Sequence, residues 1–265
     1  MNKNLCRAVG LLLMGLLAAC GASPEAEPPA QAPQAVDEAV EESLVVEEET
    51  GRLTVLCGMQ EEWCQAAIAA FEEETGIETE MVRMSSGEAL ARLKAEGEDT
   101  QFDVWYGGPS LGPGAAVQDG LIEPYISPNS SAIPETLRDL DGVWTGVYVG
   151  ALGFCSNGEL LAEFGINAPA SWDDLLAPEL ISNIAMADQR TSGTAVTAGG
   201  ALVALNDGEG GTFDYFRELD ANIFQYTKSG SAPGRMAASG EVAVSVIFSH
   251  DCVSFAEETG VDLVT

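Results

Sequence analysis

The sequence predicts an α/β fold in which mostly parallel strands carry helices on both faces, arranged as two lobes. Two observations predict this fold. Short buried apolar segments alternate with longer amphipathic segments, and this order appears both before and after a break near residues 145–150. We expect residues 51–147 to form the first lobe and residues 148–257 the second, with residues 258–265 beginning a crossover back to the first lobe.

Local signals support the expected elements of the first lobe. A capping-box pattern, with Ser85 three positions before Glu88, predicts a helix over residues 85–97. Gly76 suits the end of an earlier helix, in which Trp63, Ala67, Ala70 and Phe71 lie on one face. A buried strand is expected at residues 53–58, a second strand at 77–84 and a short apolar strand at 102–108.

The second lobe shows the same alternation. Ser171 and Asp174 favour the start of a helix over residues 171–180. Two more helices are expected at residues 191–205 and 213–222, and residues 228–235 are expected to form a loop. Strands are expected at residues 184–188, 223–227 and 242–248.

The N-terminus has the pattern of a secretory signal. Lys3 and Arg7 precede an apolar core over residues 8–17, which is too short to span a bilayer as a mature helix. The sequence Leu-Ala-Ala-Cys that ends at Cys20 resembles a bacterial lipobox. We therefore expect residues 1–19 to be a signal peptide and Cys20 to carry lipid; the alternative is an ordinary signal peptide with a chance cysteine.

Residues 20–50 are expected to be an acidic, disordered tether. After Cys20 this stretch contains four prolines, nine Asp or Glu residues and no Lys or Arg. Removing the +2 of the leader and the −9 of the tether from the whole-chain charge of −31 leaves −24 for residues 51–265. This charge argues against nucleic acid as a partner, but helix N-termini still bind small anions locally.

Four cysteines lie beyond Cys20, an even number that is typical of disulfides in an oxidising compartment. Three pairings are possible, and free buried thiols are the alternative. We favour Cys57 with Cys64 and Cys155 with Cys252. The spacing does not match a structural zinc site, and one histidine is a poor supply of ligands, so no metal and no cofactor are expected.

Small hydroxyl-bearing or glycine residues follow several of the expected strands. In open α/β sheets ligands bind at the carboxyl ends of strands, so these loops are expected to line a cleft with hydrogen-bond donors, although helix capping explains any single loop. The loops are Ser85-Ser86-Gly87, Gly107-Gly108, Thr191-Ser192-Gly193-Thr194 and Ser229-Gly230-Ser231.

His250, the only histidine of the chain, precedes Asp251 at the end of the last expected strand. A carboxylate accepts hydrogen bonds from two vicinal hydroxyls, and an imidazole donates or accepts. The chain has no G-x-S-x-G motif and no second histidine, and adjacent residues at a strand end point to opposite faces. We therefore interpret the pair as a ligand-binding dyad and do not expect an enzyme; a surface pair is the alternative.

Several stretches together resemble a known family: CGMQEEWCQAAIAAFEEETGI, SSGEALARLKAE, FDVWYGG, GALGFCSN, SWDDLL, TSGTA, QYTKSGSAP and FSHD. They resemble the substrate-binding lipoproteins and periplasmic proteins of bacterial ABC importers, in the ferric-binding-protein-like group of the two-lobed type II class. The resemblance implies a hinged periplasmic-binding-protein-like fold, a membrane permease as partner, a monomer, and a place in the cell envelope, lipid-anchored on the periplasmic or extracytoplasmic face of a membrane.

Ferric binders of this group place two adjacent tyrosines where this chain has His250 and Asp251. The sequence is closer to the branch that resembles hexose-phosphate binders, which implies a small anionic ligand such as a sugar phosphate. A ferric or phosphonate ligand is the alternative, with Tyr106 and Tyr226 as single candidate iron ligands. Members of the family usually run longer, so we expect the C-terminal return segment of the fold to be missing from this sequence.

The resemblance and the loop pattern together give the expected ligand site. Its phosphate end is the loop around Ser192, and its sugar end is the dyad, while Lys228 is a candidate point charge. The expected ligand-binding residues are Gln60, Glu61, Ser85, Ser86, Gly108, Thr191, Ser192, Gly193, Thr194, Lys228, Ser229, His250 and Asp251.

Overall fold

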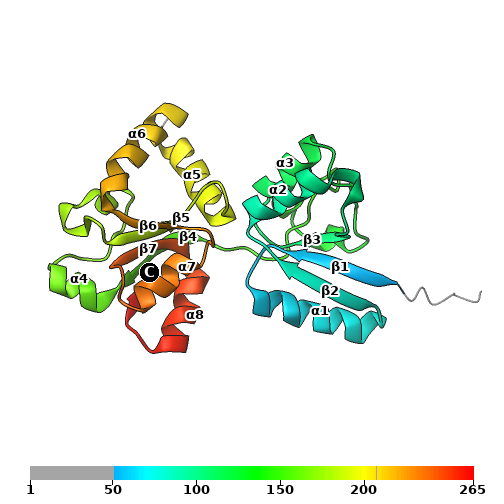
Figure 1. Cartoon of the computed structure of the whole chain (residues 1–265), viewed down its shortest axis with the longest axis horizontal. Helices are drawn as coiled ribbons and strands as arrows, with labels where there is room; N and C mark the ends of the chain where they lie inside the picture. The colour runs from blue at the N-terminus through cyan, green and yellow to red at the C-terminus, as the bar shows by residue number, and fades with distance from the viewer. Residues whose placement is uncertain (1–50, 207) are drawn as a thin grey trace, which may run out of the picture. The chain divides into compact units, whose positions relative to one another are not determined.

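The computed structural model describes residues 51–206 and 208–265. It contains two sheets, a three-stranded sheet in the order β2-β1-β3 and a five-stranded sheet in the order β6-β5-β7-β4-β8 (Figure 1). The expected signal peptide (1–19), Cys20 and the expected tether (20–50) lie outside the described residues. Within the described chain, no helix combines the length and the apolar composition needed to cross a bilayer.

The first sheet is entirely parallel. Its strands are β1 (Arg52–Cys57), β2 (Glu78–Arg83) and β3 (Val104–Tyr106), and β1 pairs with both of the others. Helix α1 lies on one face of this sheet, and α2 and α3 lie on the other (Figure 1). Their bounds are Glu61–Thr75 for α1, Ser86–Glu96 for α2 and Leu111–Gln118 for α3.

The second sheet is mixed. Strands β5 (Ile184–Ala187), β6 (Ile223–Thr227) and β7 (Val244–Phe248) are parallel, whereas β4 (Leu152–Asn157) runs antiparallel to β7 and to β8 (Leu263–Val264). Residues 258–265, expected to begin a crossover, complete α8 and form β8 beside β4. The order of elements confirms the predicted α/β fold with mostly parallel sheets.

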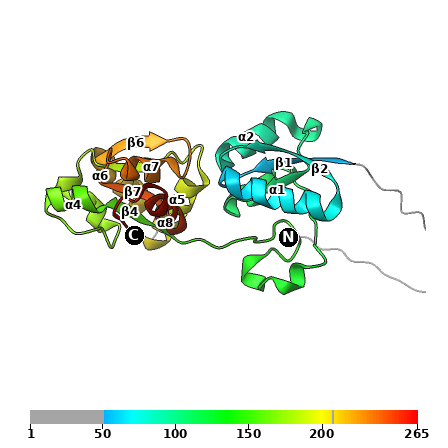
Figure 2. The same ribbon diagram turned by 90° about the horizontal axis from the view of Figure 1, so that it is seen from below.

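Five helices accompany the second sheet, with α5 and α6 on one face and α7 and α8 on the other (Figures 1 and 2). The largest hydrophobic core lies here and includes Leu180, Ile184 and Leu202. The helices are α4 (Gly158–Phe164), α5 (Gly193–Leu205), α6 (Glu209–Leu219), α7 (Ala232–Ala238) and α8 (Ser249–Thr259). The remaining turns are 3-10 helices at Gly97–Asp99, Ser130–Ala132, Glu135–Leu137, Asp173–Leu176, Pro178–Leu180 and Asp220–Asn222.

Both favoured disulfides are present: Cys57 pairs with Cys64, and Cys155 pairs with Cys252. The capping box of α2 and the left-handed Gly76 that ends α1 are also confirmed. The capping box and the helix-ending glycine were predictable because each depends on nearby residues. The disulfides were predictable because an even number of cysteines allows only a few pairings.

Two expectations about helices were wrong, at residues 171–180 and 228–235. The expected helix α1 is present, and its apolar face lies partly in solvent, since Trp63 and Phe71 are 40% and 37% exposed. The strand that α1 contacts, β2, is largely polar and offers little apolar surface to cover. Residues 171–180 form two 3-10 turns because Pro178 cannot continue a helix and holds Ala177 extended. The expected loop at 228–235 contains the start of α7.

Candidate ligand-binding site

One small cavity of about 60 Å³ is lined by the N-termini of helices that pack on the first sheet and of helices that pack on the second. The residues that cap α1, α2, α5 and α8 all line it, so backbone N–H groups and the positive ends of four helix dipoles surround the same space. The lining residues are Gly58, Met59, Gln60, Trp63, Arg83, Ser85, Ser86, Gly108, Pro109, Tyr148, Ser192, Gly193, Thr194, Gly230, Ser231, Phe248, His250 and Asp251.

One side of the cavity is a cluster of hydroxyl groups at the start of α5. Ser192 is 1% exposed, and its Oγ finds no hydrogen-bond partner among the described residues. A Cβ placed on Gly193 would lie 2.7 Å from Ser86 Oγ, and one placed on Gly230 would lie 3.0 Å from Ser192 Oγ. The two glycines therefore allow the hydroxyls of Ser86 and Ser192 to approach the backbone closely.

The turn before α5 fixes this cluster. The carbonyl oxygen of Asp188, just after β5, accepts hydrogen bonds from the N–H groups of Thr191 (3.1 Å) and Ser192 (2.9 Å). The Asp188 carboxylate is hydrogen-bonded by Arg190, which lowers the pKa of Asp188 from its ordinary value to about 2. The charged pair thus holds the turn that presents Ser192.

The dyad also lines this cavity. Asp251 is 7% exposed, and its Oδ1 accepts a hydrogen bond of 2.9 Å from Gln60 Nε2. His250 Nε2 lies 3.6 Å from the same oxygen. Contrary to the expectation of a strand end, both dyad residues lie in the first turn of α8, which is why they face one cavity instead of opposite sides of a sheet. A carboxylate in a first helical turn is also favoured by the helix dipole.

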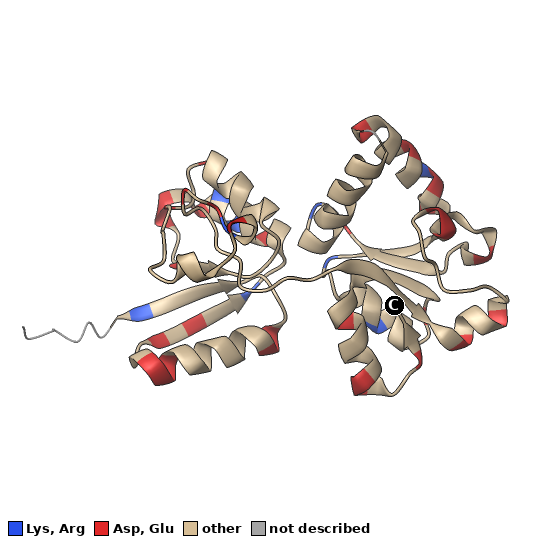
Figure 3. Cartoon of the chain, turned by 180° about the vertical axis from the view of Figure 1, so that it is seen from behind, with Lys and Arg blue, Asp and Glu red and all other residues tan. Residues whose placement is uncertain are grey.

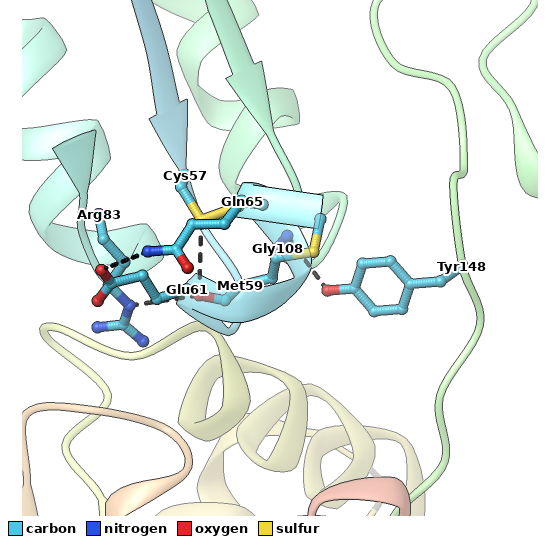
Figure 4. Close-up of a disulfide and its surroundings, with 8 residues drawn as sticks. Cys57, Met59, Glu61, Gln65, Arg83, Gly108 and Tyr148 are labelled. Atoms are coloured by element: carbon cyan, nitrogen blue, oxygen red, sulfur yellow. Dashed lines mark hydrogen bonds between the residues drawn. A yellow bond between two sulfur atoms is a disulfide. The ribbon is translucent and has the colours of Figure 1, made fainter. Parts of the chain in front are cut away.

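Aromatic rings form the wall beside the dyad. The His250 ring lies between Phe248, stacked at a centroid distance of 5.6 Å, and Trp63, tilted at 5.2 Å. Tyr148 approaches Trp63 edge-on at 5.8 Å. Its hydroxyl accepts a hydrogen bond of 3.3 Å from Gly108 N (Figure 4), and burial raises the pKa of the Tyr148 phenol. This wall provides an apolar surface next to a carboxylate.

Arg83 is the only Lys or Arg among the described residues that line the cavity. Its Nε donates a hydrogen bond of 3.3 Å to the carbonyl oxygen of Met59, which lies in the sequence between the disulfide-bonded Cys57 and Cys64 (Figure 4). Elsewhere Asp and Glu far outnumber Lys and Arg along the described ribbon (Figure 3). An anion at this site would therefore be held by local groups, not by the charge of the whole protein.

The structure brings nine expected residues to the cavity and leaves four outside it. Glu61 is exposed and accepts from Gln65 Nε2 (Figure 4). The side chain of Lys228 is exposed, and only its carbonyl oxygen takes part, accepting from Ser85 Oγ (3.3 Å) and Thr191 Oγ1 (3.0 Å). Ser229 Oγ pairs with Ser231 Oγ at 3.3 Å. Thr191, Lys228 and Ser229 thus support the loops that present other residues.

Sequence reasoning missed Arg83, Tyr148 and Ser231 as lining residues. Arg83 ends β2 at the carboxyl edge of the first sheet, and Ser231 belongs to a loop already noted, so both positions carried a usable signal. Tyr148 lies in the segment between the two sheets, where no pattern marked it.

No group suited to a metal ion appears in the described part of the chain. Of the two tyrosines considered as iron ligands, Tyr226 is 43% exposed and donates to Asp220 Oδ1, and Tyr106 does not line the cavity.

Residues 66–264 match the family model described as bacterial extracellular solute-binding protein. The chain belongs to this family. Among curated proteins, an uncharacterised protein of Haemophilus influenzae is 40% identical over 206 residues, which cover 76% of this chain. The chain spans 59% of that relative's length.

Solved structures of other proteins share the fold. The periplasmic binding protein AfuA from Actinobacillus pleuropneumoniae, solved with exogenous fructose 6-phosphate bound, is 39% identical with a TM-score of 0.75, and covers 81% of this chain and 69% of its own. The periplasmic binding protein P5PA is 34% identical with a TM-score of 0.75, and it also covers 81% of this chain and 69% of its own. Iron-bound HitA from Pseudomonas aeruginosa, at 21% identity and a TM-score of 0.69, covers 81% of this chain and 68% of its own and agrees in fold alone. These likenesses confirm the two-lobed type II periplasmic-binding-protein fold.

Proposed function

We propose that this family member is the solute-binding component of an ABC importer and that it captures a sugar phosphate for delivery to a membrane permease. The observation that carries the proposal is the buried Ser192 Oγ, without a partner among the described residues, at the start of α5. A buried hydroxyl without a partner costs free energy unless a ligand completes it. Ser192 lines the same cavity as the Gln60–Asp251 pair, which supports a ligand with two unlike ends.

The phosphate end would bind at the starts of α2 and α5. Backbone N–H groups at a helix N-terminus point at an anion, and the helix dipole favours negative charge there. The hydroxyls of Ser86, Ser192 and Thr194 add donors without adding a cation. Arg83, which also lines the cavity, supplies the one charge-assisted hydrogen bond available from the described lining.

The sugar end would bind at the dyad and the aromatic wall. Asp251 accepts from sugar hydroxyls, and Gln60 both donates and accepts, so vicinal hydroxyls match this pair. The faces of Trp63 and His250 suit the apolar C–H surface of a sugar ring. AfuA, with fructose 6-phosphate bound and 39% identity to this chain, supports the same class of ligand.

Ligand entry requires the cavity walls to separate. The free volume of about 60 Å³ is well below the several hundred Å³ usual for small-molecule sites. The walls come from the parts of the chain that carry the two sheets. They are joined by the Gln60–Asp251 and Gly108–Tyr148 hydrogen bonds, and also by those from Ser85 Oγ to Lys228 O (3.3 Å) and from Gly87 N to Thr191 O (2.9 Å). These bonds would break and re-form around the ligand, as hinge motions allow.

A thermal-shift series tests the proposal. The full chain is heated alone and with fructose 6-phosphate, glucose 6-phosphate, free fructose, inorganic phosphate, a short phosphonate, ferric citrate or a polyamine. Because a ligand that binds only the folded state raises the melting temperature, the sugar phosphates should give the largest shift. A larger shift with the phosphonate or with ferric citrate would replace the proposed ligand class.

We further propose that Cys20, outside the described residues, carries lipid and that residues 21–50 tether the binding domain to the cell envelope. Several acyl chains on one residue give lasting attachment. A Cys20→Ala chain should appear in the soluble fraction after cell fractionation, whereas the parent should remain with membranes. Equal membrane attachment of both chains would contradict the anchor.

A further inference from the structure

The N-cap and first turn of α1 carry two residues of the proposed sugar end, and the apolar packing beneath them is one small cluster, Cys57, Met59 and Cys64 with Met81 and Tyr106. Gln60 caps α1 and donates to Asp251, and Trp63 lies against His250. Of the described side chains of α1, Cys64 alone is buried. The remaining apolar residues of this helix, including Trp63 and Phe71, lie partly or largely in solvent.

The two ends of α1 are attached by different means. Near its C-terminus, Glu72 Oε1 accepts a hydrogen bond of 2.7 Å from the backbone N–H of Thr79, which ties the helix to β2. At its N-terminus no side chain caps the helix. This end is attached to the first sheet by the disulfide from Cys64 to Cys57, the last residue of β1, and by the hydrogen bond from Arg83 Nε to the carbonyl oxygen of Met59. Both cysteines are fully buried.

Helix α8, which carries the other half of the dyad, differs in this respect. Phe255 is buried against Ile247 and Cys155 in a separate core cluster. The Arg235 guanidinium covers the Phe255 ring at 4.7 Å, and Arg235 Nη1 lies 3.5 Å from Glu258 Oε2. We therefore expect the packing of Phe255 to hold α8 in place when its disulfide to β4 is removed.

We propose that the Cys57–Cys64 disulfide is a positioning element of the ligand site, which holds Gln60 and Trp63 where they meet the uncharged part of the ligand. The proposal rests on the proposed function, because it concerns the sugar end of the same cavity. Groups that are held in place before binding lose less freedom when the ligand arrives, so releasing this turn should weaken sugar contacts. Neither disulfide of the described chain joins α1 to α2 or α5, which form the phosphate end.

The two disulfides form a matched pair for the test. Cys57 and Cys64 are separated by 7 positions, whereas Cys155 and Cys252 are separated by 97. The entropy that a disulfide removes from the unfolded chain grows with loop length. A purely structural role therefore predicts that loss of Cys155–Cys252 has the greater effect on both stability and binding.

The experiment compares full chains that carry Cys57→Ala/Cys64→Ala or Cys155→Ala/Cys252→Ala with the parent. Calorimetry gives the affinities for fructose 6-phosphate and for inorganic phosphate, and heating gives Tm. Loss of Cys57–Cys64 should weaken fructose 6-phosphate about tenfold while leaving phosphate within about twofold. Loss of Cys155–Cys252 should lower Tm more and change the ratio of the two affinities less.

Hydrogen exchange gives a test that needs no ligand. Amides of residues 58–66 should exchange at least about tenfold faster in Cys57→Ala/Cys64→Ala, while those of α2 keep their protection. Equal protection, or equal loss of both ligands, would overturn the positioning role. If the parent binds no sugar phosphate, the proposed function fails, and exchange still decides whether the disulfide holds this turn.

A second variant tests whether the loss of affinity comes from the lost disulfide or from the volume lost with the cysteine side chains. Cys57→Ala/Cys64→Val restores part of the lost volume without a covalent link, and it should show the same selective loss. If neither Cys57–Cys64 variant folds, the disulfide is a structural staple and the positioning role is rejected.

Discussion

Gln60 Nε2 and Asp251 Oδ1 form a hydrogen bond of 2.9 Å across 191 residues of sequence. The bond joins the N-terminus of α1, beside the first sheet, to the first turn of α8, beside the second. In a solute-binding protein such a contact is well placed to be exchanged for hydroxyls of a ligand. The proposed recognition of sugar phosphates depends on that exchange.

Asp251→Ala should weaken binding at the sugar end of the site and leave binding at the phosphate end unchanged. Without the carboxylate, sugar hydroxyls lose their acceptor in a desolvated place, at a cost of about 1–3 kcal/mol, or roughly tenfold or more in affinity. Inorganic phosphate should bind as in the parent, because the starts of α2 and α5 are unchanged. Calorimetry with fructose 6-phosphate and with phosphate measures both effects, and equal losses would show that the dyad does not bind hydroxyls.

Ser192→Ala should have the opposite selectivity. Its Oγ makes no hydrogen bond with the described residues, so its removal should leave the stability of the free protein unchanged or slightly higher. Phosphate and fructose 6-phosphate should both weaken, by about fivefold or more, since one donor to the anion is lost.

Ser156→Ala is the matched control for Ser192→Ala. Ser156 is also fully buried on β4 with no partner for its Oγ among the described residues, but it does not line the cavity. Its loss should leave both affinities unchanged. If Ser192→Ala binds phosphate as well as Ser156→Ala does, α5 is not the phosphate end.

Ferric iron should give no strong phenolate-to-iron colour. Tyr148 is the only tyrosine among the described lining residues, and burial raises its pKa, which disfavours a phenolate. Titration with ferric citrate, followed by visible absorbance, measures this directly. A stoichiometric coloured complex that survives excess citrate would favour iron over a sugar phosphate.

The Asp188–Arg190 pair should stabilise the fold only above acidic pH. Arg190 lowers the pKa of Asp188 to about 2 in the folded protein. Because this folded-state pKa lies below the unfolded value, the stabilisation is complete above about pH 4 and is lost as the pH falls through about 2. The effect is small, since the Arg190 side chain is 87% exposed.

Unfolding of the parent and of Arg190→Gln at several pH values measures this effect. The parent should be more stable at pH 7, and the difference should shrink towards zero near the folded-state pKa. A difference that grows on acidification would contradict the assigned cause.

Local sequence signals predicted several of the residues that line the cavity. Strand ends followed by Ser, Thr or Gly mark the carboxyl edge of a parallel sheet, and Ser86, Ser192 and Thr194 do line the cavity. The capping box of α2 and the cysteine pairings were predicted for similar reasons, since each depends on spacing or on an even count.

Long-range geometry was not available from the sequence. The position of Tyr148 depends on how the segment between the sheets passes Gly108, 40 residues earlier. The dyad was expected at the end of a strand. Because α8 starts at Ser249, His250 and Asp251 lie in its first turn and both line the cavity. Periodicity predicted which residues share one face of α1, but how far that face is buried depends on the opposing surface, and β2 is mostly polar.

Competition calorimetry tests the central claim most directly, because it asks whether one cavity holds both ends of one ligand. Fructose 6-phosphate is titrated into the full chain at increasing concentrations of inorganic phosphate. The account predicts that its apparent affinity falls in proportion to phosphate occupancy, and that free fructose competes far more weakly than phosphate. An unchanged affinity for fructose 6-phosphate under saturating phosphate, or no binding of fructose 6-phosphate at all, would contradict it.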